Sequence, residues 1–235
     1  MKIALPLFAA LIVAGCNSSA PTPSGDKASA KPSSGAAPSQ VSDAAIPASL
    51  KNDAYDYYGL ASEKPHTFKV TQDGKAQDDQ TMTVALKSIG KDEATYDYVT
   101  EGGPNGALTV TWSLRPTGLY DMALTPGELV SKQILECPAK LTKGFTWKPR
   151  EVIKSNGSTI SVQTNYNVAG PEKIATPAGP FETIRVDATG SGTTGSTPIS
   201  LTASAWYSKG VGLVKQKETT KIGNKATTSV QVLKK

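Results

Sequence analysis

The chain is poor in the residues from which most catalytic and metal centres are built. Its 235 residues include one histidine and two cysteines. A single histidine offers no imidazole pair for a zinc site, and nothing around His66 predicts a relayed nucleophile. Two cysteines, Cys16 and Cys137, exclude a framework of several disulfides. We therefore predict no catalytic residue, no metal site and no cofactor, and expect that the protein is not an enzyme.

Long apolar runs are also absent, apart from one short stretch at the N-terminus. Residues 3–13 are apolar and follow a basic residue, a length that fits a secretory signal and is too short to span a bilayer. The run ends in Val13-Ala14-Gly15-Cys16, which resembles the lipobox of bacterial lipoproteins. The resemblance implies that residues 1–15 are removed as a signal peptide. It also implies that Cys16 carries lipid and anchors the protein to the membrane.

After the apolar run, bulky apolar residues are scarce as far as residue 46. Residues 16–46 are rich in serine, alanine and proline, and cannot bury enough surface to offset the entropy of ordering them. We predict a lipidated, disordered tether over 16–46 and a β-rich domain over 47–235. An exported, tethered protein is not expected to bind nucleic acid. Asn17 after the lipidated cysteine favours the outer membrane if the source is Gram-negative.

Helical periodicity is missing from the predicted domain, where apolar and polar residues alternate instead. In residues 107–115, for example, Leu108, Val110 and Leu114 fall on one face of an extended chain. The same pattern predicts strands at 81–86, 158–168, 181–188, 200–207, 213–219 and 227–233. Little helix is expected, namely one or two turns within residues 127–136.

Short turn signals separate the expected strands. Asn105-Gly106, Asn156-Gly157 and Gly223-Asn224 each lie between extended runs and predict hairpins, and successive hairpins form an antiparallel sheet. Residues 190–195 match a dinucleotide-binding fingerprint by their letters. Because no helix is expected to follow them, we interpret them as a mobile hairpin loop.

Three segments resemble a known family. Residues 135–147 resemble a "PL-x-x-G-x-x-W" motif, residues 176–183 resemble "TPAGTFET", and residues 206–215 resemble "WYAPGVGLVK". In this order they look like an uncharacterised family of bacterial envelope lipoproteins, distantly similar in fold to the lipoprotein carriers LolA and LolB. The resemblance implies a single antiparallel, strongly curved sheet, a half-barrel. It implies fold more than function, because one fold hosts many functions.

The motif residues also have a direct physical interpretation as turns. Pro177 fixes φ and Gly179 permits a conformation closed to other residues, so they predict a tight connection into the strand that contains Phe181. Gly210 and Gly212 predict a sharp chain reversal. These roles are structural.

Aromatic residues supply the candidates for a ligand site. Trp112, Trp147 and Trp206 could line a groove for a lipid or another apolar ligand, and core packing explains them equally well. Trp206 is expected on the core face of its strand and Tyr207 on the opposite face.

These features predict a lipid-anchored envelope protein of unknown specific function. We expect it to bind an apolar ligand, a lipid or a protein partner on its curved sheet without catalysing a reaction. The alternative is a structural or assembly accessory of an envelope or cell-surface complex, and a hydrolase is less favoured.

Overall fold

The computed structural model describes residues 45–62, 64–104, 106–131, 133–155 and 157–234. Within them, fifteen strands form one antiparallel sheet, and helix is confined to a few turns near the N-terminal end. The predictions of a mainly β fold, a single antiparallel sheet and little helix are therefore confirmed. The predicted signal peptide, the lipidation site at Cys16 and nearly all of the tether lie outside the described residues and stay predictions.

The helical part is a 3₁₀ turn, Ala48–Leu50, and the short helix α1, Asp53–Tyr57, whose first turn is capped by the side chain of Asn52. No helix among the described residues is long and apolar enough to cross a membrane. The strands are β1 (His66–Gln72), β2 (Lys75–Ala76), β3 (Gln80–Ile89), β4 (Ala94–Gly102), β5 (Leu108–Arg115), β6 (Gly118–Thr125), β7 (Glu128–Leu129), β8 (Ile134–Pro138), β9 (Thr146–Trp147), β10 (Arg150–Ser155), β11 (Ser158–Thr176), β12 (Gly179–Thr194), β13 (Thr197–Ser208), β14 (Gly212–Ile222) and β15 (Lys225–Leu233).

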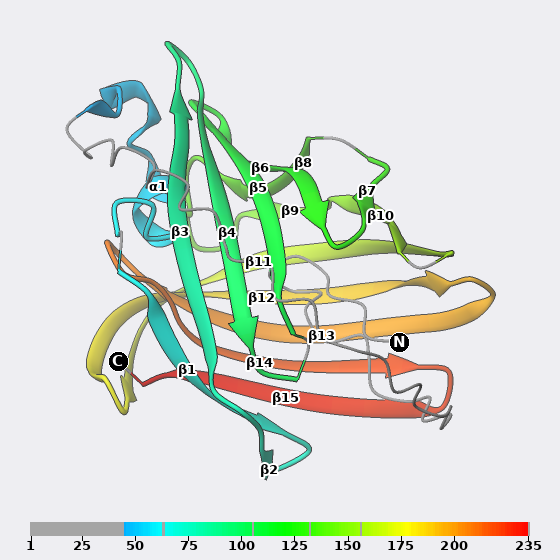
Figure 1. Cartoon of the computed structure of the whole chain (residues 1–235). Helices are drawn as coiled ribbons and strands as arrows, with labels where there is room; N and C mark the ends of the chain where they lie inside the picture. Colours follow the sequence, from blue (N-terminus) through cyan, green and yellow to red (C-terminus); the bar gives the residue numbers. More distant parts are fainter. Residues whose placement is uncertain (1–44, 63, 105, 132, 156, 235) are drawn as a thin grey trace, which may run out of the picture.

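The sheet has two parts that run in different directions. Its strand order is β7-β10-β11-β12-β13-β14-β15-β1-β3-β4-β5-β6-β8, with β2 on β1 and β9 on β11. Strands β10 to β15 form one part, which we call the long-strand wing, and β3 to β6 with β8 form the other, the short-strand wing. Figure 1 shows the short-strand wing running steeply across the long-strand wing.

The expectation of a strongly curved half-barrel is wrong for this sheet. The sheet is open, with β7 at one edge and β8 at the other, and its change of direction is concentrated at one corner (Figure 1). Strand β1 pairs with β3 over His66–Phe68 only, whereas β11 pairs with β12 over almost its whole length. Long ladders keep neighbouring strands aligned, so the sheet bends at this short ladder between two longer strands.

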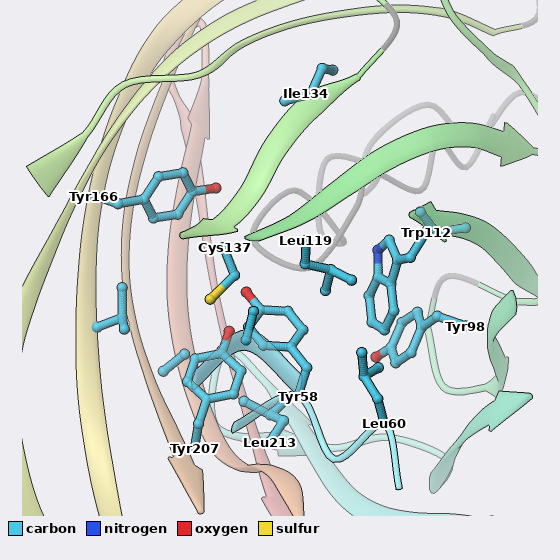
Figure 2. Packing of buried hydrophobic residues seen from close by; sticks show 14 of the residues in the cluster. Tyr58, Leu60, Tyr98, Trp112, Leu119, Ile134, Cys137, Tyr166, Tyr207 and Leu213 are labelled. Carbon is cyan, nitrogen blue, oxygen red and sulfur yellow. The ribbon is translucent and has the colours of Figure 1, made fainter. Parts of the chain in front are cut away.

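The core lies between the two wings, with Tyr58 at its centre. Trp112 of β5 stacks on Tyr98 at 4.5 Å between ring centroids and meets Tyr58 edge-on at 5.6 Å. Tyr58 in turn stacks on Tyr207 of β13 at 5.0 Å. Figure 2 shows Tyr58, which follows α1, between the aromatic residues of the two wings. The segment after α1 is therefore a wedge that joins the wings, and such aromatic contacts add to the energy of burial.

Two local predictions are wrong because pairing overrides local composition. The described residues of 127–136 form no helical turn; they contribute to β7 and β8, one at each edge of the sheet. Most of residues 190–195 lie inside β12 and form no mobile loop. A Cβ atom on Gly192 would collide with the carbonyl of Ser161 on β11, so this glycine permits a close approach between strands.

Candidate functional site

A small cleft lies at the corner between the two wings. Its volume is about 30 Å³, enough for a water molecule or the end of an alkyl group. Apolar side chains form most of its wall, and polar ones lie at its rim. The lining residues are Tyr58, Gly59, Ser62, Lys64, His66, Phe68, Met82, Val84, Tyr98, Val211, Gly212 and Leu213. An apolar wall with a few convergent polar groups is typical of a site for a small molecule.

The rim of the cleft carries a histidine and a lysine. His66 is half-buried, and burial lowers its pKa, which keeps the imidazole neutral at neutral pH. Ser62 Oγ lies 3.5 Å from His66 Nε2, at the limit of a hydrogen bond. Lys64 is exposed and supplies a positive charge beside the opening.

The turn between β13 and β14 fixes the wedge against the long-strand wing. Gly210 and Gly212 both have positive φ, as the predicted reversal requires. The amide of Gly210 donates to the carbonyl of Asp56 at 2.8 Å. A Cβ atom on Gly212 would lie 3.1 Å from the carbonyl oxygen of Tyr58. The glycines of the "WYxxGVGLVK" motif thus permit close backbone packing, which places Tyr58 in the core.

Four carboxyl groups are buried in the core between the wings. Tyr58 connects them to the cleft, because its hydroxyl donates to Glu136 Oε1 at 3.0 Å. Asp121 of β6, Glu136 of β8, Glu151 of β10 and Glu218 of β14 have exposed fractions of 0%, 3%, 5% and 1%. We call these four residues the acid cluster. Buried charges in proteins are normally paired or neutralised by protonation.

Burial raises the pKa of every member of the acid cluster. The pKa of Glu136 rises to about 7, although the hydrogen bond from Tyr58 opposes the rise. Burial raises the pKa of Glu151 to about 8, and the nearby Glu136 and Glu218 add to the effect. For Glu218 the pKa also rises to about 8 by burial, against hydrogen bonds from Thr220 and Gln216. Protonated carboxyl groups are therefore abundant in this core at neutral pH.

The acid cluster lacks basic partners and is incompletely hydrogen-bonded. No lysine, arginine or histidine forms an ion pair with any of the four acids in the part of the chain that the structure describes. Within the same residues, four buried oxygen atoms lack a hydrogen bond of good geometry. They are both carboxyl oxygens of Asp121, Glu151 Oε2 and the hydroxyl oxygen of Tyr207. Burial raises the pKa of Asp121 well above its usual range, and the carboxyl groups of Glu136 and Glu151 raise it further.

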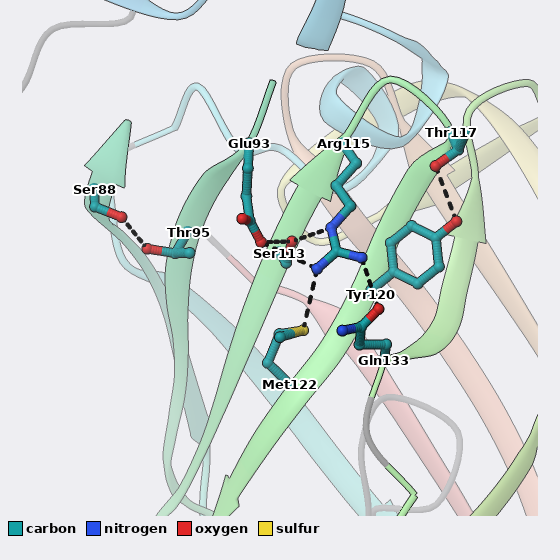
Figure 3. A network of polar contacts seen from close by, with 9 residues as sticks. All are labelled: Ser88, Glu93, Thr95, Ser113, Arg115, Thr117, Tyr120, Met122 and Gln133. Atoms are coloured by element: carbon teal, nitrogen blue, oxygen red, sulfur yellow. Dashed lines mark hydrogen bonds and ion pairs between the residues drawn. The ribbon is translucent and has the colours of Figure 1, made fainter. Parts of the chain in front are cut away.

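A second polar network, on β4 to β6, is well satisfied by comparison. Arg115 donates to Ser113 Oγ at 2.9 Å and to Gln133 Oε1 at 3.0 Å, and it pairs with Glu93 at 3.2 Å (Figure 3). The Ser113 hydroxyl donates to Glu93. Because this buried hydroxyl is already committed to Glu93, the network is structural and is a poor candidate for nucleophilic chemistry.

A second hollow is larger but poorly suited to an apolar ligand. It measures about 390 Å³ and is lined by small and polar residues beside β7, β10 and β11. The lining residues are Pro126, Gly127, Glu128, Lys154, Ser155, Gly157, Ser158 and Thr159. The corner cleft, with its apolar wall, is therefore the better candidate for such a ligand.

The structure separates the three tryptophans proposed from sequence. Trp112 lies in the core on Tyr98, and Trp147 stacks on Tyr166 at 4.7 Å. Trp206 lies on the outer face of the long-strand wing, where its indole donates to Glu172 at 3.1 Å. None of the three lines the corner cleft.

The expected orientation of Trp206 and Tyr207 is reversed. Tyr207 reaches the core and stacks on Tyr58, whereas Lys215 Nζ lies 4.8 Å from the ring centre of Trp206 on the outer face. Alternation along β13 is unbroken, because Leu201, Ala203, Ala205 and Tyr207 are all buried on the core side. The period of two residues along β13 therefore places Tyr207 on the core face and Trp206 on the opposite one. The register shift at this point lies in the partner strand, where Val214 of β14 is skipped.

The other motif residues form a tight hairpin. Thr176 pairs with Gly179, so Pro177 and Ala178 are the two residues that join β11 to β12. Gly179 has a φ of 124°, and the amide of Ala178 donates to Thr176 Oγ1 at 3.1 Å. Phe181 follows on β12 and packs against the core while half-buried. The predicted turn therefore exists, far from the corner cleft in the strand order.

Neither the cleft nor the acid cluster was predicted from the sequence. A signal for the cluster was present, because Glu151, Ile153 and Ser155 alternate with less buried residues and share one face of β10. Gln216, Glu218 and Thr220 do the same on β14. Polar residues at inward positions of a strand indicate a polar interior, but their phase follows only from the strand register.

The fold is an open, all-antiparallel β-domain whose apolar core also contains buried carboxyl groups. Comparison with known families gives a match for part of the chain. Residues 130–233 match the sequence profile of a family described as DUF3108-like. This segment contains β8 to β15, and thus the long-strand wing. No curated protein matches the chain.

Two solved structures share the fold over most of the chain. A presumed lipoprotein from Parabacteroides distasonis ATCC 8503 has a TM-score of 0.54 and 17% identity, covering 77% of this chain and 97% of that one. A presumed exported protein with a YmcC-like fold, from Bacteroides fragilis NCTC 9343, has a TM-score of 0.55 and 13% identity, covering 77% and 98%. The hypothetical lipoprotein YmcC from Escherichia coli K12 has a TM-score of 0.36 and 11% identity, covering 79% and 90%. At these identities the first two likenesses concern the fold alone.

Proposed function

We propose that this chain is a lipoprotein of the bacterial cell envelope that binds the apolar end of a ligand in the corner cleft, without catalysis. Cys16 anchors the protein through its lipid, in the outer membrane if the source is Gram-negative. The lipobox supports this location. The likeness to a presumed lipoprotein and a presumed exported protein supports it too.

The apolar wall of the corner cleft is the observation that carries the binding proposal. Phe68, Met82 and Val84 come from the two strands at the corner, and Leu213 faces them from β14. The volume fits the end of a chain and not a whole lipid. The charge of Lys64 at the rim suits a ligand whose polar end is anionic. A fatty acid or a lipid with one accessible chain end has this chemistry.

The polar residues at the rim of the cleft favour a binding role over hydrolysis. Ser62 and His66 are the pair from which a nucleophile could be built there, yet their contact is 3.5 Å long. In the described part of the chain, no carboxylate hydrogen-bonds to the His66 ring to orient it. The pair is therefore better suited to contact a polar head group.

A fluorescent fatty acid titrated into the chain that begins at Asn17 tests the proposal. Val84→Trp fills the cleft and is expected to weaken binding about tenfold or more, as loss of a buried apolar contact does. Val130→Trp is the matched control, because Val130 is 42% exposed and lies outside the cleft. Equal binding by both variants, or no binding by the parent chain, would exclude the cleft as a lipid site.

An accessory role in a surface complex is the alternative, and one observation favours it. Val130 and Phe145 are the large apolar residues recorded as exposed in the described residues, at 42% and 44%. The segments that hold them pair with β10 and β11 near an open edge of the sheet. Two results together would favour this role. The parent chain would cross-link to a protein partner in cells while binding no lipid, and the Val130→Asp variant would lose that cross-link.

A further inference from the structure

The acid cluster is divided between the two wings of the sheet. Asp121 and Glu136 belong to the short-strand wing, and Glu151 and Glu218 belong to the long-strand wing. All four side chains point into the core between the wings and are at most 5% exposed. Ionisation of the cluster would therefore place like charges on opposite sides of the main packing interface.

Among the residues that the structure describes, no lysine, arginine or histidine faces the cluster. The titratable groups that face it are the hydroxyls of Tyr58, Tyr98, Tyr166 and Tyr207 and the thiol of Cys137, which itself lies near Asp53. Burial raises the pKa of each of these tyrosines and of Cys137. At neutral pH the cluster carboxyls are therefore the groups in this core whose charge changes.

We propose that the charge of the acid cluster controls the packing of the two wings: neutral carboxyl groups hold the wings together, and ionised ones drive them apart at the corner. A carboxylate that ionises in this core has neither solvent nor a cation to stabilise it. Separation of the wings admits water to the carboxylates, which removes the cost. The inference goes beyond ligand binding and does not depend on it.

Tyr58 connects this change to the surface. It hydrogen-bonds Glu136, stacks on Tyr207 of the long-strand wing and lines the corner cleft. Movement of the wings apart therefore displaces the wedge and widens the cleft. The transition is expected near neutral pH, because burial places the pKa of Glu136 at about 7 and those of Glu151 and Glu218 at about 8.

Hydrogen exchange in the mature full-length chain tests the inference directly. After correction for the intrinsic effect of pH, we expect opening of residues 53–60 and of β8 to increase about tenfold or more between about pH 5 and about pH 8.5. Binding of a hydrophobic dye should increase over the same interval. An opening constant that is independent of pH would overturn the inference.

Variants in which a cluster carboxyl is replaced by a neutral amide test whether the cluster causes the pH dependence of opening. Glu136→Gln and Glu151→Gln should each reduce the pH dependence of opening. Glu101→Gln, on the exposed part of β4, should leave it unchanged. An equal pH dependence in all three variants would overturn the proposal.

A measurement on the unmodified chain keeps the test decisive if a variant fails to fold. Difference infrared spectroscopy reports protonated carboxyl groups directly, and at about pH 6.5 it should show buried protonated groups that ionise as exchange increases. Full ionisation of all carboxyl groups by about pH 6, with the wings still packed, would overturn the proposal.

Discussion

Neutralising Glu218 should make the protein more stable at alkaline pH and leave it little changed in acid. The side chain is 1% exposed and accepts hydrogen bonds from Gln216 and Thr220. Burial raises its pKa from 4.5 to about 8. The folded protein therefore holds this proton more tightly than the unfolded chain does, so the stability that it contributes is complete below about pH 4.5 and is lost as the pH rises towards 8.

The size of the effect follows from the shift of the pKa. One unit corresponds to about 1.4 kcal/mol, so the shift of Glu218 corresponds to about 5 kcal/mol over the whole range. About 4 kcal/mol of this falls between about pH 5 and about pH 8. The replacement Glu218→Gln keeps the shape and removes the charge, at a cost of about 1 kcal/mol for the altered hydrogen bonds.

Urea denaturation at several pH values measures this prediction. The free energy of unfolding of the parent chain should fall as the pH rises from about 5 to about 8, and that of Glu218→Gln should fall by about 3 to 4 kcal/mol less. Glu101→Gln, exposed on β4, is the matched control and should follow the parent chain. Parallel curves for the parent chain and Glu218→Gln would refute the reasoning, because they would show that Glu218 ionises normally in the fold.

Three further substitutions test other parts of the structure. Trp112→Ala should lower the free energy of unfolding by about 3 to 5 kcal/mol, because the indole is 1% exposed and packs on Tyr98 and Tyr58. Gly212→Ala, at a φ of 93° and against the carbonyl of Tyr58, should lower the melting temperature more than Gly195→Ala, which has open space around it. Tyr58→Phe removes the hydrogen bond that lowers the pKa of Glu136, so infrared titration should show that carboxyl ionising at higher pH than in the parent chain.

Local pattern was sufficient to predict most strands. Alternation in residues 107–115 corresponds to β5, and the turn at Pro177 and Gly179 joins two strands as expected. The wrong predictions concern segments whose structure is decided by pairing with a neighbouring strand. Residues 190–195 are rich in glycine and lack apolar residues, yet they extend β12 because β11 continues beside them. Strand ends depend on the length of the partner, which local composition does not contain.

The site was harder to predict because its members are distant in sequence. Tyr58, Met82 and Leu213 meet in the cleft only because β1 joins the two wings at the corner. The acid cluster has the same origin: each carboxyl lies on a different strand, and its inward direction depends on register. Trp206 and Tyr207 are neighbours in β13, and the structure shows that Tyr207 is the one that faces the core.

The sequence by itself determined the anchor motif, the antiparallel β class and the positions of the turns, because these depend on short segments and on a period of two residues. The tertiary structure alone decided the bend, the corner cleft and the burial of Asp121, Glu136, Glu151 and Glu218. These features arise from the packing of one wing on the other. Burial changes the charge of a carboxyl group only when solvent is excluded from it on every side. A single strand cannot exclude solvent in this way, whereas two packed wings can.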